Sequence, residues 1–191
     1  MGLTIQEFFE KTGESPVIPA IKNDEWLASL PSADCKIAYI LYGNICNIAD
    51  IVAAVKKTGK RAIVHLDLIS GLGSKEFSVD FIKQYTQADG IISMKPNVVK
   101  RARELGMFTI QRFYTIDALS YANVAKHSQN CDPDVVEIMP AGLTKIIGYL
   151  RQDIKKPIVA SGLVMDEADV LGALKVGAMA VSTTNRKLWN C

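Results

Sequence analysis

The sequence predicts an α/β protein whose 191 residues form one domain, a small (β/α)8 barrel of the TIM type. Two observations predict this fold: short runs rich in valine and isoleucine recur along the chain, and amphipathic helical patterns lie between them. Such alternation is typical of a parallel sheet covered by helices. No linker or low-complexity stretch divides residues 1–191, so a second domain is not expected. An open doubly wound sheet has the same pattern and is the alternative fold.

The expected strands are too short to be helices, and their apolar character suits burial on both faces of a sheet. They are Val17–Ile21, Ile37–Leu41, Ala62–Leu66, Gly90–Ser93, Phe108–Gln111, Val135–Ile138, Ile158–Ala160 and Ala178–Ser182. Apolar residues recur at helical spacing in the segments 48–55, 77–85, 98–105, 146–150 and 170–174. Thr4 and Glu7 have the spacing of a capping box, which predicts a helix within residues 1–15. Because such barrels usually have ~250 residues, some connections must be short, and residues 23–35 are one candidate.

The composition is that of an ordinary globular protein, with 49% hydrophobic residues and a net charge of +2. No apolar run reaches the ~18 residues of a membrane span, and residues 1–10 lack the basic start of a signal peptide. We therefore expect a cytoplasmic protein without a membrane partner; association with further copies of the chain stays open. No metal site and no cofactor are expected, because the cysteines show no metal-ligand spacing: Cys35, Cys46, Cys131 and Cys191.

Two turns near the C-terminus predict a site for a phosphate group. Ser161-Gly162 follows the seventh expected strand, and Ser182-Thr183-Thr184 closes the eighth. The turns after the last two strands of a parallel barrel bind phosphate through free backbone N–H groups and hydroxyls. A phosphorylated small molecule is therefore the expected ligand.

Charged side chains stand at the ends of other expected strands: Lys22, His65, Asp67, Lys95, Arg112 and Glu137. If their strand continues, His65 and Asp67 face the same side, where they could act as a general base pair, bind ligand hydroxyls or satisfy buried backbone groups. An isolated carboxylate is costly inside an apolar strand, so Glu137 should have a cationic partner among Lys22, Lys95 and Arg112. Lys95 would contact an anion, form a Schiff base or remain a solvated turn residue.

A glycine-containing loop at residues 68–76 leads into an expected helix with Ser74 as its N-cap. Such a loop either closes over a ligand or serves as an ordinary connection. It is not a phosphate-binding P-loop, because Lys75 is not followed by serine or threonine.

Longer segments carry a more specific signal, in one register from about Pro16 to Trp189. They are Val64–Leu68, Gly71–Glu76, Asp89–Asn97, Thr109–Phe113, Val136–Pro140, Ala180–Asn185 and Leu188–Trp189. These segments resemble the glycerol-3-phosphate-responsive antiterminator family, the glycerol uptake operon antiterminators of bacteria. The resemblance implies a barrel that binds glycerol 3-phosphate and then the leader mRNA of a glycerol-utilisation operon, so that transcription passes a terminator.

The resemblance also gives the polar residues above a shared role, as ligands of glycerol 3-phosphate. The expected set is Lys22, His65, Asp67, Lys95, Arg112, Glu137, Ser161, Gly162, Ser182, Thr183 and Thr184. The chain departs from the family pattern at Ser161 and Ala141, where glycine is expected. A serine there would either crowd a phosphate or give it a hydroxyl.

The family implies a regulator rather than an enzyme. The alternative is an enzyme acting on a small phosphate ester, such as an isomerase, an aldolase or a glycerophosphodiester phosphodiesterase. His65 with Asp67 or Glu137 would then supply acid–base chemistry, and Lys95 a Schiff base. RNA would need an additional basic surface; residues 56–61 and 100–103 hold basic clusters of a kind that is usually a solvated helix face.

Overall fold

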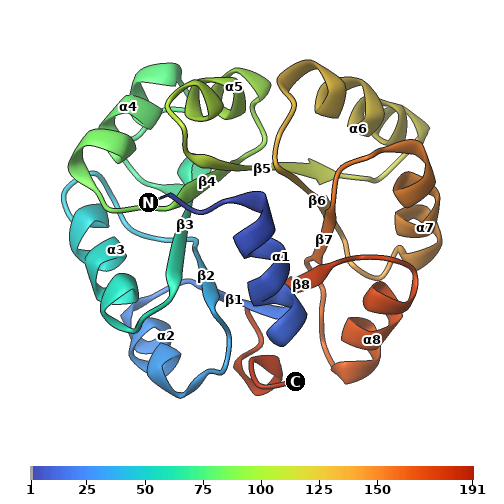
Figure 1. The fold of residues 1–191 in the computed structure, drawn as a ribbon, viewed down its shortest axis with the longest axis horizontal. Helices are drawn as coiled ribbons and strands as arrows, with labels where there is room; N and C mark the ends of the chain where they lie inside the picture. Colours follow the sequence, from blue (N-terminus) through green and yellow to red (C-terminus); the bar gives the residue numbers. More distant parts are fainter. Residues whose placement is uncertain (1) are drawn as a thin grey trace.

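The computed structural model describes residues 2–191, which form a closed barrel of parallel strands in the order β1 to β8. Figure 1 shows the strands around the centre, the first helix of the chain across the middle of the barrel, and the other helices as an outer ring. The strands are β1 (Val17–Ile21), β2 (Ile37–Ile40), β3 (Arg61–His65), β4 (Gly90–Ser93), β5 (Phe108–Tyr114), β6 (Val135–Met139), β7 (Ile158–Ser161) and β8 (Ala180–Thr183). Because β8 pairs with β1, the sheet has no free edge, and the alternative of an open sheet is wrong.

The helices connect successive strands, except for the first, which precedes the barrel. They are α1 (Ile5–Glu14), α2 (Asp24–Ser29), α3 (Ile48–Lys57), α4 (Glu76–Tyr85), α5 (Pro96–Glu104), α6 (Ala118–Cys131), α7 (Thr144–Asp153) and α8 (Glu167–Lys175). The expected short connection at residues 23–35 consists of α2 and a single 3-10 turn at Leu30–Ser32. The chain fits the barrel into few residues because this connection and several loops are brief.

Alternation along the strands determines which side chains enter the barrel. Apolar residues such as Ile63, Ile110 and Val135 belong to the cluster inside the barrel, whereas their neighbours pack against the helices. Side chains alternate between the faces of a strand, so the next inward positions fall two residues later. Those positions are His65, Arg112, Glu137, Ser161 and Ser182, each within two residues of the carboxyl end of its strand. The barrel is therefore apolar at its amino end and polar at its carboxyl end.

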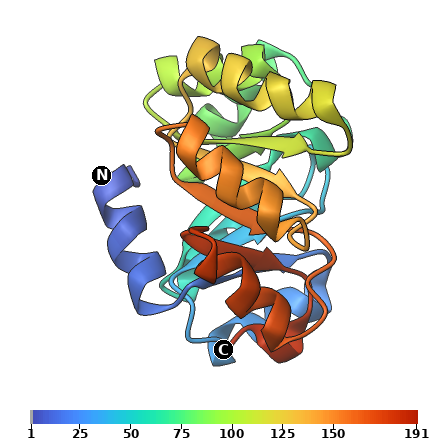
Figure 2. The same ribbon diagram turned by 90° about the vertical axis from the view of Figure 1, so that its right-hand side faces the viewer.

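Helix α1 covers the amino end of the barrel, at the left of Figure 2. Its Thr4 N-cap accepts a hydrogen bond from the backbone of Glu7, as the capping spacing predicted. The Phe8 ring is fully buried and stacks on Phe108, the first residue of β5, with ring centroids 5.0 Å apart. This contact places an aromatic side chain from α1 inside the apolar end of the barrel.

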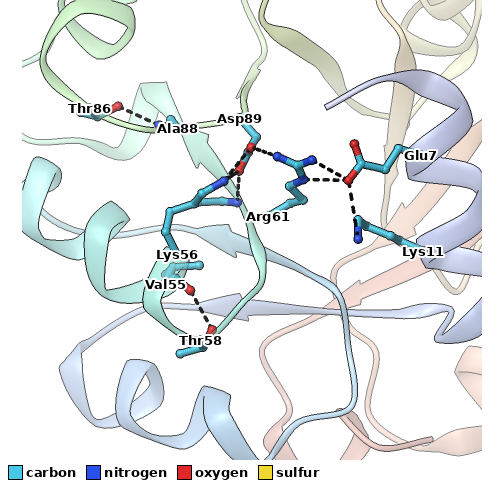
Figure 3. A network of polar contacts seen from close by, with 10 residues as sticks. Glu7, Lys11, Val55, Lys56, Thr58, Arg61, Thr86, Ala88 and Asp89 are labelled. Atoms are coloured by element: carbon cyan, nitrogen blue, oxygen red, sulfur yellow. Dashed lines mark hydrogen bonds and ion pairs between the residues drawn. The ribbon is translucent and has the colours of Figure 1, made fainter. Parts of the chain in front are cut away.

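Charged residues fasten α1 to the barrel, as Figure 3 shows. Arg61 at the start of β3 donates to Glu7 of α1 and, at 2.7 Å, to Asp89. Lys56 of α3 donates to both Asp89 oxygens, at 2.7 and 2.6 Å, and the backbone N–H of Ala62 donates to the same carboxylate at 2.8 Å. Each carboxylate in this network has a cationic partner.

The sequence located every strand, but several ends differ. β5 continues three residues past Gln111 because its register with β6 extends to Tyr114↔Met139. β8 begins at Ala180 rather than at 178, and β3 covers Arg61–His65 rather than Ala62–Leu66. Helix α6 shows no clear apolar stripe in the sequence, since alanine, serine and asparagine fill much of it, and it was not among the expected helices.

Candidate functional site

A pocket of about 450 Å³ opens at the carboxyl end of the barrel, where β1, β7 and β8 meet. Its walls come from β1, β7 and β8, the turns that follow them and the start of α2, with further residues from β5, β6 and the end of β2. The lining residues are Ala20, Lys22, Trp26, Leu41, Arg112, Met139, Ser161, Gly162, Leu163, Val164, Met165, Ser182, Thr183, Thr184 and Asn185. Both turns that the sequence singled out for phosphate therefore border one pocket.

The turn after β7 presents a buried hydroxyl and an unusual backbone. The Ser161 side chain is only 2% exposed, and its Oγ has no hydrogen-bond partner within residues 2–191. Gly162 and Leu163 both have positive φ, +75° and +55°, so the chain turns away sharply from the strand. A Cβ at Gly162 would lie 2.6 Å from Cε of Met139, so this position suits only glycine without rearrangement.

The turn after β8 is tied to the turn after β7. Thr183 Oγ1 accepts from the backbone N–H of Asn185 at 3.0 Å, and Asn185 Nδ2 donates to the Met165 carbonyl at 2.9 Å. The buried Trp189 ring donates from Nε1 to the Thr183 carbonyl at 3.1 Å and so packs the last segment onto the barrel. The two turns thus form one connected wall.

Arg112 and Glu137 form a buried ion pair beneath this wall. Parallel pairing of β5 with β6 places the two residues opposite each other, and Arg112 Nε donates to Glu137 Oε2 at 2.6 Å. Burial disfavours the charged guanidinium, but the adjacent carboxylate outweighs it and the pKa of Arg112 is raised. Glu137 therefore has a cationic partner as expected, and of the three candidates it is Arg112; the second carboxylate oxygen, Oε1, has no partner within residues 2–191.

Tyr39 adds a polar atom to the barrel interior that the sequence analysis did not single out. Its ring is fully buried, and the hydroxyl has no hydrogen-bond partner in the described chain. Burial raises the pKa of this phenol, and the negative charge of Glu137 raises it further. The inward spacing of β2, with Ile37, Tyr39 and Leu41 on one face, was the signal that could have found it.

His65 is buried and uncharged at neutral pH. Burial, reinforced by the positive charge of Arg112, lowers the pKa of His65 to about 3, although Asp67 acts in the opposite direction. Its Nδ1 lies 4.0 Å from Asp67 Oδ2, beyond hydrogen-bond distance, and has no partner among residues 2–191. The strand ends at His65 and a 3-10 turn follows, so the alternation that would align the two side chains does not continue.

Asp67 instead holds neighbouring backbone and loop in place. Its carboxylate accepts from the hydroxyls of Ser74 and Ser93, at 2.9 Å each, and from the backbone N–H of Met94 at 2.7 Å. Ser74 is therefore not the N-cap of α4; that position belongs to Lys75. These bonds make Asp67 a positioning residue that joins the loop at 68–76 to β4.

The loop at residues 68–76 is also bound to the loop that follows β2. The Ser70 backbone N–H donates to the Gly43 carbonyl at 3.0 Å, and the Ile45 N–H donates to the Ser70 carbonyl at 2.9 Å. Gly71 has φ of +84°, and a Cβ there would lie 3.0 Å from the Ile45 side chain. Of the two interpretations of this loop, its contacts favour the ordinary, fixed connection.

The two lysines of the expected site have different surroundings. Lys22 lines the pocket, and its Nζ lies 4.1 Å from the centre of the Trp26 ring. Lys95 is exposed at the start of α5 and is not among the lining residues, and its backbone N–H donates to Ser93 Oγ at 3.0 Å. Of the expected site residues, the pocket lining brings together Lys22, Arg112, Ser161, Gly162, Ser182, Thr183 and Thr184. Glu137 does not line the pocket but is paired with Arg112, which does. His65, Asp67 and Lys95 are not part of the lining.

Neither a metal cluster nor a membrane span is found in the described chain. Residues 2–191 contain no group of three or more His, Cys, Asp or Glu side chains arranged to hold a metal ion. No helix in the same range is both long and apolar enough to cross a membrane.

Comparisons with known proteins point to one family. A model of the glycerol-3-phosphate responsive antiterminator family matches residues 17–189 of the chain. A curated relative, the uncharacterized protein YgcP of Escherichia coli (strain K12), is 40% identical over 176 residues, which are 92% of this chain and 92% of that protein.

Solved structures agree with the sequence match. A glycerol uptake operon antiterminator regulatory protein from Listeria monocytogenes has a TM-score of 0.88 at 28% identity, covering 92% of this chain and 95% of that chain. A glycerol uptake operon antiterminator-related protein from Thermotoga maritima has a TM-score of 0.81 at 28% identity, covering 91% and 96% of the two chains. Aldolases at 10% or 11% identity share the fold alone.

Proposed function

Because the chain belongs to the glycerol-3-phosphate responsive antiterminator family, we propose that its pocket binds glycerol 3-phosphate and that the occupied protein binds the leader mRNA of a glycerol-utilisation operon. Membership assigns the chain to a family of regulators, as the sequence resemblance implied, and the enzymatic alternative is set aside. The effector is a phosphate monoester with two hydroxyls. The pocket offers chemistry for both parts.

The phosphate is assigned to the wall formed by the turns after β7 and β8. The observation that carries the proposal is the buried, unpartnered Ser161 Oγ, next to a left-handed turn that brings the backbone of residues 162–165 to the pocket. A buried hydroxyl without a partner is costly, and a phosphate oxygen would satisfy it. Lys22 and the buried Arg112 supply positive charge on the same pocket. The departure from glycine at Ser161 is thereby assigned as an added donor.

The glycerol hydroxyls are assigned to the polar layer inside the barrel. Glu137 Oε1 and the Tyr39 hydroxyl are both buried without a partner in residues 2–191, and Arg112 links this layer to the pocket. A carboxylate oxygen accepts from an alcohol, and a phenol both donates and accepts. Inorganic phosphate cannot use this layer, and glycerol cannot use the turns. Both should therefore bind far more weakly than glycerol 3-phosphate.

RNA binding would then follow the effector by linkage. A ligand that binds one conformation more tightly raises the population of that conformation, and any RNA contact made only there is strengthened by the same free energy. The proposal therefore predicts that glycerol 3-phosphate increases RNA affinity and that RNA increases effector affinity by an equal factor.

Tryptophan fluorescence tests the effector site directly. The chain has 2 tryptophans, Trp26 and Trp189. Trp26 lines the pocket, and the centre of the Trp189 ring lies 6.0 Å from the centre of the Trp26 ring. Titration with glycerol 3-phosphate should change the emission saturably. Glycerol and inorganic phosphate should require at least about 100-fold higher concentrations, since each forfeits several hydrogen bonds to charged groups. Equal affinity for inorganic phosphate would contradict the proposal.

A pair of serine variants distinguishes the loss of a phosphate contact from the loss of a buried hydroxyl. Ser161→Ala should weaken glycerol 3-phosphate about tenfold or more, because a hydrogen bond to a charged group contributes about 1.5–3 kcal/mol. Ser78→Ala is the matched control: Ser78 Oγ is equally buried and unpartnered but lies in α4, away from the pocket. If both variants bind like the unmodified protein, Ser161 is not a phosphate donor.

Gel-shift titration of leader RNA with and without glycerol 3-phosphate tests the second half of the proposal. Binding should strengthen when the effector is present. Absent binding, or binding that ignores the effector, would refute it.

A further inference from the structure

The carboxyl end of the barrel carries exposed apolar side chains that extend beyond the lining of the effector pocket. Large apolar side chains project from the loops and helix starts at this end: Phe77 (64% exposed) and Ile116 (80%) lie outside the pocket lining, and Leu163 (75%) and Met165 (72%) belong to it. Exposed apolar groups concentrated on one face mark an interaction surface. The opposite end is covered by α1, as Figure 2 shows.

Cations stand beside the aromatic rings of this surface. Lys75 Nζ lies 6.0 Å from the centre of Phe77, and Lys145 Nζ lies 5.8 Å from the centre of Tyr149, whose side chain is 47% exposed. The other cation–aromatic contacts within residues 2–191 join Lys22 and Arg186 to Trp26, at the same end. An exposed ring next to a flexible cation is the pairing that holds a nucleobase and its phosphate.

The positive charge at this end is available for binding. Lys75, Lys95 and Lys145 are exposed and form no ion pair with the described part of the chain. Two of the acidic side chains at this end, Asp117 and Asp166, cap the starts of α6 and α8. Glu76, between Lys75 and Phe77, is exposed in the first turn of α4 and carries the opposite charge. In contrast, Lys56, Arg61 and Arg103, from the basic clusters singled out in the sequence, are held in ion pairs elsewhere.

We propose that single-stranded leader RNA binds across the carboxyl end of the barrel, over the mouth of the pocket, with Phe77 and Tyr149 as stacking platforms beside Lys75 and Lys145. This inference rests on the proposed function and gives it a surface. RNA bound over the mouth of the pocket slows dissociation of the effector. An effector bound in the pocket in turn fixes the conformation of the residues at the mouth, which contact the RNA. One face thus carries both ligands, and their coupling needs no long-range conformational path.

Helix α4 provides a matched pair of double variants. Lys75 and Phe77 lie at its start, on the proposed surface, whereas Lys83 and Tyr85 lie at its far end; Phe77 and Tyr85 are 64% and 59% exposed. The carboxyl-end variant is Lys75→Ala with Phe77→Ala. The amino-end control is Lys83→Ala with Tyr85→Ala. Both remove one cation and one exposed ring, so a general loss of charge or stability affects them alike.

Binding of fluorescently labelled leader RNA at saturating glycerol 3-phosphate tests the proposal. The carboxyl-end variant should bind RNA about 5- to 150-fold more weakly, the range expected for losing one stacked base, and its salt dependence should decrease by about one phosphate contact. The amino-end control should bind like the unmodified protein. Effector affinity, measured by tryptophan fluorescence, should be unchanged in both and shows that both are folded.

Other outcomes separate the surface from the function. If the unmodified protein binds RNA in an effector-dependent way but the carboxyl-end variant binds equally well, or only the amino-end control is weakened, the surface is wrong and the proposed function stands. Crosslinking of this face to a protein in place of RNA would have the same meaning. If the unmodified protein binds no leader RNA, both proposals are overturned together.

Discussion

The two ends of the barrel treat polar groups in opposite ways. At the amino end, Glu7, Arg61, Asp89 and Lys56 form a network in which each carboxylate has a cationic partner, and α1 covers the apolar interior. At the carboxyl end, buried oxygens of Tyr39, Glu137 and Ser161 have no partner within residues 2–191. Since buried polar groups are normally satisfied, the first end is built for stability and the second for a ligand.

The largest expected effect comes from breaking the buried pair at the carboxyl end. Arg112→Met leaves the fully buried carboxylate of Glu137 without its cation, which should lower the free energy of unfolding by about 3–5 kcal/mol. It should also abolish effector binding. Urea unfolding followed by circular dichroism measures the first effect, and tryptophan fluorescence the second.

A variant at the other end calibrates this result. Arg61→Met removes an equivalent cation, but its side chain is 24% exposed and Asp89 keeps Lys56, so the loss should be about 1 kcal/mol with normal effector binding. Combining Arg112→Met with Glu137→Gln should recover part of the stability and none of the binding. A greater loss for Arg61→Met than for Arg112→Met would reverse the comparison.

A cavity at the amino end should affect stability alone. Phe8→Ala removes a fully buried ring that stacks on Phe108 and should lower the free energy of unfolding by about 3 kcal/mol. The loss is expected near the lower end for such replacements, because α1 can shift into part of the space. Effector affinity should stay unchanged, and a clear change would show that the two ends are coupled.

Acid should destabilise the protein through the carboxyl end. The pKa of His65 is lowered to about 3 from the ordinary value of 6.5, so below pH 6.5 the unfolded chain binds a proton that the folded chain does not. The contribution of His65 to the free energy of unfolding is fully present above pH 6.5. It is lost as pH falls toward 3, at about 1.4 kcal/mol per pH unit. Between pH 6.5 and 5, where most carboxylates remain ionised, the loss should be about 2 kcal/mol.

Urea unfolding at pH 7 and pH 5 measures this loss. His65→Asn should remove most of the pH dependence in this window. His127→Asn is the matched control, because His127 is the other histidine and lies on α6 outside the barrel. If the His65 variant keeps the full pH dependence, another group is responsible.

The fold was predictable because its information is local. Short apolar runs separated by helical stripes specify parallel strands with both faces covered, and their number and order place Ser161 and Ser182 at neighbouring strand ends. Helix α6 was missed because its sequence lacks an apolar stripe, and packing against the barrel stabilises it instead. Thus the sequence predicts those strands and helices whose apolar residues recur with a clear period.

The site was predictable only in part, since partners depend on register. Glu137 clearly required a cation, but the choice of Arg112 over Lys22 and Lys95 follows from the pairing of β5 with β6. The 3-10 turn after His65 likewise redirects Asp67 to Ser74 and Ser93, a change that no spacing indicates. No feature of the sequence indicated that Trp26 lines the pocket, because its position depends on how α2 packs beside Lys22.

The smallest expected effect comes from the outer part of the amino-end network. Glu7→Gln removes one partner of Arg61, but the Glu7 side chain is 25% exposed and Arg61 still contacts Asp89. Solvent screens such a pair, so the free energy of unfolding should fall by less than about 1 kcal/mol, and by less still at high salt. Asp89→Asn is the graded comparison: its carboxylate is 5% exposed and also accepts from Lys56 and the Ala62 backbone, so it should cost more than Glu7→Gln. Urea unfolding of both variants at low and high salt measures the order. Equal losses would mean that this end depends on the helix contact with Phe8 rather than on charge.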